Sequence, residues 1–269
     1  MSPMLNIAIR AARNAGSIIT RYMDRLDGLN VSAKGHNDFV SEVDRQAELE
    51  IIQTIQKAYP DHGILAEESR PEPSDHDYLW IIDPLDGTTN YLHGFPQFAV
   101  SIALQYKGSL EQAVIYDPLR QELFTATRGA GAYLNEKRIR VSKSGSKTGL
   151  TGTLLGTGFP FKWPEHLDTY LLTFKSLLVQ TAGIRRAGSA ALDLAYVGAG
   201  RLDGFWEIGL SPWDMAAGIL IIQEAGGLVS DFGGGRDFLK TGNLVAGTPT
   251  VFKAILNDIQ PHLSESLSK

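Results

Sequence analysis

The segment WIIDPLDGTTNYLH, residues 80–93, places two carboxylates at the end of an apolar strand and constrains this chain more than any other feature. Two like charges about 4 Å apart repel by roughly 4 kcal/mol at an effective dielectric constant of 20, so a packed strand end is a poor place for them without a cation. Magnesium prefers oxygen ligands and is commonly held by a few carboxylates. The segment therefore predicts a divalent cation near Asp83, Asp86 and the Leu85 carbonyl. The alternative is an Asp-Pro turn followed by an Asp-Gly turn.

Two expected helix starts carry further polar groups. Gly87 and Thr88 follow the acids, and free backbone N–H groups in a first helical turn favour an anion. Ser41 and Asp44 have the spacing of a capping box, with Ser41 at the cap and Asp44 three residues later. A capping role for Asp44 is compatible with a functional one.

Three other acidic positions stand at strand or helix ends. Glu67 and Glu68 end a short apolar run, Glu207 ends another, and Asp214 follows Ser211-Pro212-Trp213. Each has an ordinary alternative, namely a solvated loop, a surface acid, or a first-turn acid that the helix dipole stabilises.

Apolar periodicity divides the chain into two helices and a partly antiparallel sheet, followed by alternating helices and strands. The spacing predicts helices over 5–23, 41–58, 165–181, 189–197, 212–225 and 249–259. β-type runs predict strands over 63–66, 78–82, 98–106, 112–116, 122–127, 202–206, 228–231 and 243–246. The Ser-, Gly- and Lys-rich segment 142–152 is the expected connection between two lobes, about 1–141 and about 153–269, of a single domain spanning 1–269.

The composition excludes several classes of protein. The 269 residues include no cysteine, which removes thiol catalysis and cysteine metal sites and suits a reducing compartment, so we expect a cytoplasmic protein. No apolar run approaches the roughly 18 residues of a membrane span. The net charge of −5 argues against sequence-independent nucleic-acid binding. The six histidines are scattered, and we interpret them as surface or packing residues.

Two long motifs resemble the signatures of the inositol monophosphatase family of metal-dependent phosphatases. They are WIIDPLDGTTNY and WDMAAG, the latter continuing to Gly226-Gly227. MLNIAIRAARNAG, KGHNDFVSEVD and GSAALDLAYVGAGRLDGFWEIGL are most similar to the bacterial SuhB-type branch of that family. The resemblance covers the chain from the first helix to the last. It implies an α+β fold, a layered αβαβα sandwich with mixed sheets like that of inositol monophosphatases and fructose bisphosphatases, and an active site between the lobes.

The resemblance also implies two magnesium ions per site, with a third as a looser addition. Glu67, Asp83 and the Leu85 carbonyl correspond to the ligands of the first ion. Asp83, Asp86 and Asp214 correspond to those of the second, and a third ion would use Glu67.

The remaining roles carry over in the same way. Thr88 and Asp44 correspond to the pair that orients the attacking water and, with Glu67, form the implied catalytic set. The Gly87 and Thr88 N–H groups correspond to a phosphate cradle. The implied substrate contacts are Asp86, Gly188, Ser189, Ala190 and Glu207, with Lys34 at the rim of the site.

The implied function is magnesium-dependent hydrolysis of myo-inositol-1-phosphate or a related polyol or sugar monophosphate by water, inhibited by lithium. Bisphosphate-cleaving relatives need additional basic or aromatic groups, and the segments GSAAL and EIGLS supply none. The small Ser211-Pro212 pair before the second motif departs from other members, so the substrate is less determined than the chemistry.

The alternative is an interaction protein. SuhB-type members are associated with the Nus transcription antitermination machinery for ribosomal RNA, which implies Nus factors or RNA polymerase as partners, with catalysis secondary. We expect a homodimer that uses apolar surface around 192–197, and no direct contact with nucleic acid or membrane.

Overall fold

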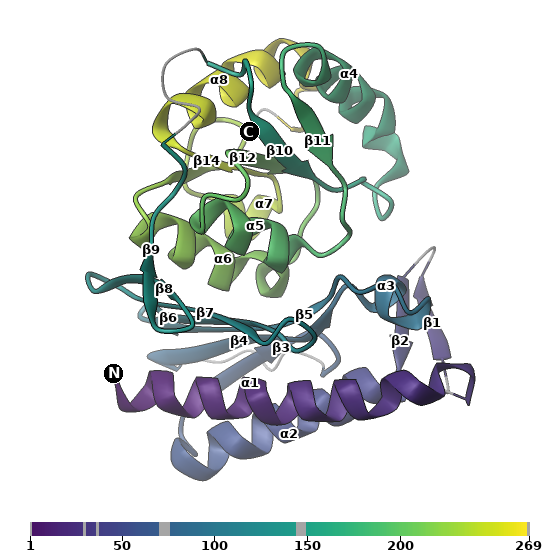
Figure 1. The fold of residues 1–269 in the computed structure, drawn as a ribbon, viewed down its shortest axis with the longest axis vertical. Helices are drawn as coiled ribbons and strands as arrows, with labels where there is room; N and C mark the ends of the chain where they lie inside the picture. Colours follow the sequence, from purple (N-terminus) through teal and green to yellow (C-terminus); the bar gives the residue numbers. More distant parts are fainter. Residues whose placement is uncertain (1, 29–30, 36–37, 70–75, 144–148, 268–269) are drawn as a thin grey trace.

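The computed structural model describes residues 2–28, 31–35, 38–69, 76–143 and 149–267, without the side chains of residue 24 and of residues 27–40. Five layers alternate through the molecule (Figure 1). The helices α1 (Pro3–Tyr22) and α2 (Glu42–Ala58) cover one face of a seven-stranded sheet. Between that sheet and a five-stranded one lie α5 (Ala190–Gly198) and α6 (Pro212–Glu224), and the outer face of the second sheet is covered by α4 (Leu167–Leu178) and α8 (Pro249–Ile259). The expected αβαβα sandwich is confirmed.

The two sheets are both mixed. The larger runs in the order β3 (Gly63–Ala66), β4 (Tyr78–Asp86), β5 (Ala99–Tyr106), β6 (Ser109–Asp117), β7 (Glu122–Thr127), β8 (Gly131–Leu134) and β9 (Lys137–Ile139), with only β3 and β4 parallel. The smaller runs β11 (Gly183–Arg185), β10 (Leu154–Thr157), β12 (Gly204–Glu207), β14 (Leu244–Gly247) and β13 (Leu228–Ser230), with β10 parallel to both of its neighbours. A separate antiparallel pair joins β1 (Val31–Gly35) and β2 (Asp38–Ser41).

The regular pairing of β4 with β5 breaks where the acids stand. The register shifts between Asp83 and Asp86. Pro84 lies between them and has no N–H to donate, so the ladder cannot continue through it. The two carboxylates therefore occupy an irregular strand end, directly before the short helix α3 (Thr88–Leu92).

The two central helices are buried on all sides because a sheet covers each of their faces. Leu192, Leu194 and Val197 are fully buried, so the expectation of exposed apolar surface over 192–197 is wrong. Most of the exposed large apolar side chains of the described residues lie instead on α4, in the segment before it and at its end, namely Phe159, Phe161, Trp163, Leu167, Leu171, Leu172, Leu178 and Val179, which are 37–78% exposed.

The periodicity reveals the long elements and misses short ones. The strands β1, β2, β8, β9, β10 and β11 and the helix α7 (Phe238–Thr241) have three to five residues each, too few for a repeating apolar pattern. The helix expected over 165–181 is α4, which starts later because Pro164–His166 form a 3-10 turn. Part of the expected connection, 144–148, lies outside the described residues. Among the described helices, none is both long and apolar enough to cross a bilayer.

Candidate active site

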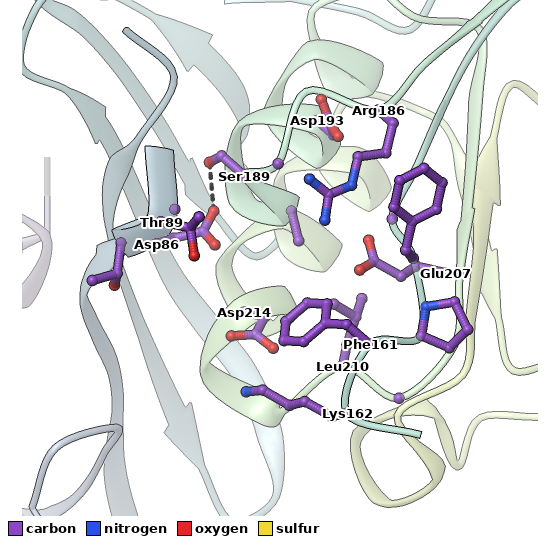
Figure 2. Close-up of a pocket in the computed structure, with 18 of the residues that line it drawn as sticks. Asp86, Thr89, Phe161, Lys162, Arg186, Ser189, Asp193, Glu207, Leu210 and Asp214 are labelled. Carbon is purple, nitrogen blue, oxygen red and sulfur yellow. Dashed lines mark hydrogen bonds between the residues drawn. The ribbon is translucent and has the colours of Figure 1, made fainter. Parts of the chain in front are cut away.

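Four carboxylates from three segments of the chain meet at one cavity between the sheets. Asp83 and Asp86 end β4, and Glu67 follows β3, which runs parallel to β4 and ends at the same edge. Asp214 reaches the cavity from the first turn of α6 (Figure 2). One oxygen each of Asp83, Asp86 and Asp214 lies within 4.8 Å of the others. The structure thus brings together all four acids that the sequence suggests as cation ligands.

Hydrogen bonds from the backbone orient these acids. Asp83 accepts the N–H of Leu85 at 3.0 Å, and Asp214 accepts the N–H of Ser211 at 2.7 Å. The second bond is half of a capping box at the start of α6, where Pro212 occupies a first-turn position that needs no N–H. Since a carboxylate can accept about four hydrogen bonds or ligand contacts, these bonds fix the side chains and leave capacity for a cation.

The cluster is strongly biased against carrying three negative charges. Burial raises the pKa of Asp86 to about 6 and that of Asp214 to about 8, and nearby carboxylates add to both shifts. Burial, followed by repulsion from Glu67, Asp86 and Asp214, raises the pKa of Asp83 well above its ordinary value. A cation would remove this cost, and an all-oxygen set suits a hard divalent ion such as magnesium. The residues therefore fit the implied metal.

Thr88 and Asp44 are joined beside the cluster. The Thr88 hydroxyl lies 2.9 Å from Asp44 Oδ1 and 3.0 Å from the Leu85 carbonyl oxygen. Asp44 is fully buried and also accepts the N–H and hydroxyl of Ser41, at 2.8 and 2.5 Å. Burial raises the pKa of Asp44, and the hydrogen bonds from Ser41 and Thr88 oppose that shift. Asp44 therefore caps α2 and holds Thr88 at once.

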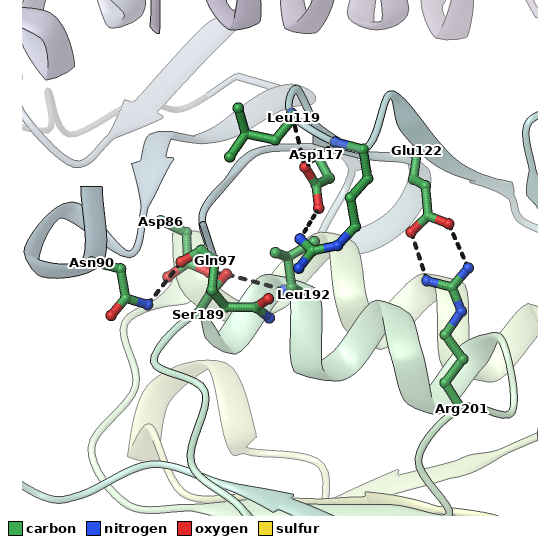
Figure 3. Close-up of polar contacts among 10 residues, drawn as sticks. Asp86, Asn90, Gln97, Asp117, Leu119, Glu122, Ser189, Leu192 and Arg201 are labelled. Atoms are coloured by element: carbon green, nitrogen blue, oxygen red, sulfur yellow. Dashed lines mark hydrogen bonds and ion pairs between the residues drawn. The ribbon is translucent and has the colours of Figure 1, made fainter. Parts of the chain in front are cut away.

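Polar contacts at the cavity join segments that are far apart in the sequence (Figure 3). Asp86 accepts the Ser189 hydroxyl at 2.5 Å, across 103 residues of sequence. The Asn90 amide donates to a backbone carbonyl of the segment before α5 at 2.9 Å. Farther out, Arg201 forms a bidentate ion pair with Glu122 at 2.5 and 2.6 Å, which lowers the pKa of Glu122. Asp86, a candidate metal ligand at the end of β4, is thus held directly by the start of α5.

Gly87 is required by this close approach. Its φ is +92°, and a Cβ there would lie 2.8 Å from the Gln97 carbonyl oxygen and 3.2 Å from that of Gly188. Gly87 and Thr88 line the cavity at the start of α3, as a phosphate cradle would require.

The cavity, of about 380 Å³, extends from the acids to the second lobe. Gly188, Ser189, Ala190 and Glu207 all line it. Burial raises the pKa of Glu207 well above its ordinary value. Gly158 was not anticipated from the sequence, yet any side chain there would overlap the Glu207 carboxylate.

The far wall of the cavity corrects one expectation. Basic and aromatic groups are present after all, supplied by Phe159, Phe161, Lys162, Trp163 and Arg186. The Arg186 guanidinium lies 4.7 Å from the centre of the Phe159 ring. The segments GSAAL and EIGLS supply no such groups, as expected, but other segments do, so the cavity does not lack the groups that a bisphosphate would need. The compact run Phe159-Pro160-Phe161-Lys162-Trp163 was the available signal, and it lies between periodic segments.

Three other residues considered from the sequence lie away from the cavity or outside the described side chains. The side chain of Lys34 lies outside the described residues. The backbone N–H of Glu68 donates a hydrogen bond to Glu48 Oε2 at 2.7 Å, and Glu68 does not line the cavity. His62 stacks between Tyr59 and Tyr78, a packing role as expected.

Comparisons with known proteins agree with this geometry. The sequence profile of the inositol monophosphatase family matches residues 1–264. Similar curated proteins include Nus factor SuhB of Pseudomonas aeruginosa, 59% identical, and Nus factor SuhB of Escherichia coli K12, 55% identical, each aligned over 100% of both chains. Similar structures include the extragenic suppressor protein suhB of Bartonella henselae, with a TM-score of 0.93, 44% identity and coverage of 97% of this chain and 100% of that one. The Thermotoga maritima IMPase has a TM-score of 0.87 and 35% identity over 97% of this chain and 98% of that one.

Proposed function

The chain belongs to the inositol monophosphatase family, and from this membership we propose that it is a magnesium-dependent phosphatase of polyol or sugar monophosphates, with myo-inositol-1-phosphate as the leading candidate substrate. One observation carries the proposal. One oxygen each of Asp83, Asp86 and Asp214 lies within 4.8 Å of the others, at a cavity large enough for a small phosphate ester.

The proposed ligand set follows the acids around the cavity. Glu67, Asp83 and the Leu85 carbonyl would hold a first magnesium ion, and Asp83, Asp86 and Asp214 a second. Glu67 would also serve a looser third. When bound, the ions would supply the positive charge that activates a water nucleophile and stabilises the leaving oxygen.

The proposed role of Thr88 follows from its single hydroxyl hydrogen. If the Leu85 carbonyl binds a cation, the hydroxyl donates to Asp44 instead, and its lone pairs can then accept a hydrogen from the attacking water. Asp44 acts through Thr88, because capping bonds already fix its carboxylate. The N–H groups of Gly87 and Thr88 would bind phosphate oxygens.

The two lobes would divide the substrate between them. The first lobe would hold the phosphate, and Ser189, Ala190 and Glu207 of the second would contact the polyol. The Glu207 carboxyl group is buried in a water-poor setting, where it can exchange hydrogen bonds with substrate hydroxyls. Lys34 is proposed only as a rim residue.

A phosphate-release screen tests this function. Purified protein would be assayed on monophosphates and bisphosphates, with magnesium and with excess chelator, alongside Asp83→Asn as the matched inactive control. We expect release from polyol monophosphates that chelator and Asp83→Asn both abolish, and inhibition by lithium. Release that survives both treatments would exclude this site, and a preference for bisphosphates would reassign the substrate to suit the basic far wall.

The relatives support a second candidate function. Full-length relatives 59% and 55% identical to this chain are named Nus factor SuhB, so we also propose a role in a cytoplasmic transcription complex, with Nus factors or RNA polymerase as partners. That role would use the molecular surface, whereas the acids face an internal cavity. Both functions can therefore belong to one chain.

We further propose that the protein is a homodimer that uses α4. Leu167, Leu171 and Leu178 are 44–50% exposed, and their spacing of four and seven residues places them on one helical face. Exposed apolar stripes of this kind are typical of protein interfaces.

A further inference from the structure

Asp193 is a buried acid at the cavity with no role in the function proposed above. It lies in α5, one turn after Ser189, and its backbone N–H donates to the Ser189 carbonyl at 3.0 Å. Ser189 and the backbone N–H of Ala191 both bind Asp86, at 2.5 and 2.8 Å. The position of Asp193 is therefore fixed relative to the acid cluster.

The Asp193 side chain has no hydrogen-bond partner among the described residues, although Arg186 acts on it electrostatically. It is 2% exposed and lines the cavity, yet within the described part of the chain it accepts no side-chain hydrogen bond and forms no ion pair. It is the one charged residue in α5, whose other residues are apolar apart from a single tyrosine. Burying an unpaired polar group costs free energy, so a residue that served only the fold would be apolar or hydrogen-bonded.

Its electrostatic neighbours define the kind of group that could satisfy it. Burial, and then Asp86, raise the pKa of Asp193, while Arg186 lowers it. Repulsion from Asp193 in turn raises the pKa of Glu207. Arg186 extends along this end of the cavity, where Phe159 contacts it (Figure 2).

We propose that Asp193 is a specificity residue for the polyol end of the cavity, and that its carboxyl group binds a substrate hydroxyl beyond the one that Glu207 binds. This inference rests on the proposed phosphatase function. A hydroxyl group can donate to either carboxyl group without adding charge. A second phosphate at this end of the cavity would instead face the carboxyl groups of Asp193 and Glu207 beside the Arg186 guanidinium. Hydroxyl-rich monophosphates are therefore favoured.

The test separates the two ends of the substrate. myo-Inositol-1-phosphate is compared with phenyl phosphate, which has a phosphate but no hydroxyl. Free myo-inositol and inorganic phosphate are compared as inhibitors, since each occupies only one end. The variants are Asp193→Ala and Asp193→Asn, and thermal melts establish that each is folded. If Asp193→Ala does not fold, Asp193→Ser replaces it, because the serine hydroxyl is shorter than the aspartate side chain and cannot reach the substrate hydroxyl.

In Asp193→Ala we expect KM for myo-inositol-1-phosphate and the inhibition constant of myo-inositol to rise about tenfold. KM for phenyl phosphate and inhibition by inorganic phosphate should stay within twofold. Asp193→Asn should restore most of the loss, because the amide oxygen still accepts a hydrogen bond.

A matched control removes a buried acid elsewhere in the second lobe. Asp231 is 4% exposed, accepts N–H groups at 2.7 and 3.0 Å, and does not line this cavity. Asp231→Asn should leave both substrates and both inhibitors unchanged below its melting temperature.

Other outcomes overturn the inference. If KM for both esters and the inhibition constants of both inhibitors rise equally, Asp193 only supports the acid cluster. If none of these constants changes, Asp193 does not contact the substrate. Either result leaves the phosphatase proposal standing. A wild-type protein that hydrolyses neither ester overturns both proposals together.

Discussion

The Thr88 hydroxyl lies 2.9 Å from Asp44 Oδ1 and so connects the start of α3 to the start of α2 across 44 residues of sequence. Asp44 is fully buried and bonded to Ser41, which leaves it little freedom to move. A short, flexible hydroxyl is thereby held at the edge of the acid cluster by a fixed acceptor.

Replacing Thr88 by alanine tests this arrangement. The change removes the hydroxyl but no carboxylate, so kcat should fall about 100-fold or more while magnesium affinity changes little. Steady-state kinetics over a magnesium titration measures both. Thr88→Ser keeps the hydroxyl and is the control, expected within about tenfold of wild type. A collapse of magnesium affinity with kcat preserved would make Thr88 a support for the ligands.

Asp83→Asn should abolish turnover, with a loss of about 1,000-fold or more, because it removes a charge that both proposed ions share. The metal-free variant should also melt at a higher temperature than metal-free wild type, since repulsion from Glu67, Asp86 and Asp214 is relieved. Differential scanning calorimetry in chelator measures the second effect. Activity within tenfold of wild type at saturating magnesium would contradict the assignment.

The raised pKa values set the direction of the pH dependence. Folding raises the pKa of Asp86 from 3.8 to about 6 and that of Asp214 to about 8, so folded protein holds protons that unfolded chain has lost. The contribution of these two groups to the stability of the metal-free protein is therefore most favourable below about pH 4, and it becomes less favourable as pH rises to about 8. Magnesium competes with those protons, so its affinity and kcat/KM should increase between about pH 6 and 8.

Melting temperatures in chelator and in magnesium across this range measure both effects. The gap between the two curves should widen as pH rises. Parallel curves would mean that the acids are not coupled to the metal. Asp214→Asn, measured in chelator, should flatten the upper part of the metal-free curve.

Leu171→Asp should convert a dimer to a monomer, because it places a charge in the apolar face of α4. Leu171 is 50% exposed, and Leu49 on α2 is 55% exposed, so Leu49→Asp is a matched control that should leave the dimer intact. Light scattering after size exclusion distinguishes the two. A dimer that tolerates Leu171→Asp would place the interface elsewhere.

Asp214→Asn should separate catalysis from partner binding. The variant loses a proposed magnesium ligand and should be inactive, yet bind purified Nus factors or RNA polymerase as well as wild type, because Asp214 lines the cavity and the proposed partner role would use the molecular surface. Pull-downs with and without magnesium measure this. Loss of binding in a folded, inactive variant would make the cavity itself the docking surface.

Local sequence patterns predicted much of the molecule. A continuous apolar run ending in Asp83 marks a buried strand end, and the Ser41–Asp44 spacing marks a helix start, because both depend on residues close in sequence. The family motifs extended this to the αβαβα layers.

Only the tertiary structure decided what meets at the cavity. Asp193, Arg186 and Gly158 carry no local signal for function, and each matters because β10, β11, β12 and α5 bring it close to Glu207 or to the acid cluster. Burial of Leu192 to Val197 likewise comes from sheets on both faces of α5, formed by strands up to about a hundred residues away in sequence. Hydrogen bonding and periodicity within a segment are set by neighbours a few residues apart, whereas burial and the convergence of side chains depend on long-range packing, which no local pattern encodes.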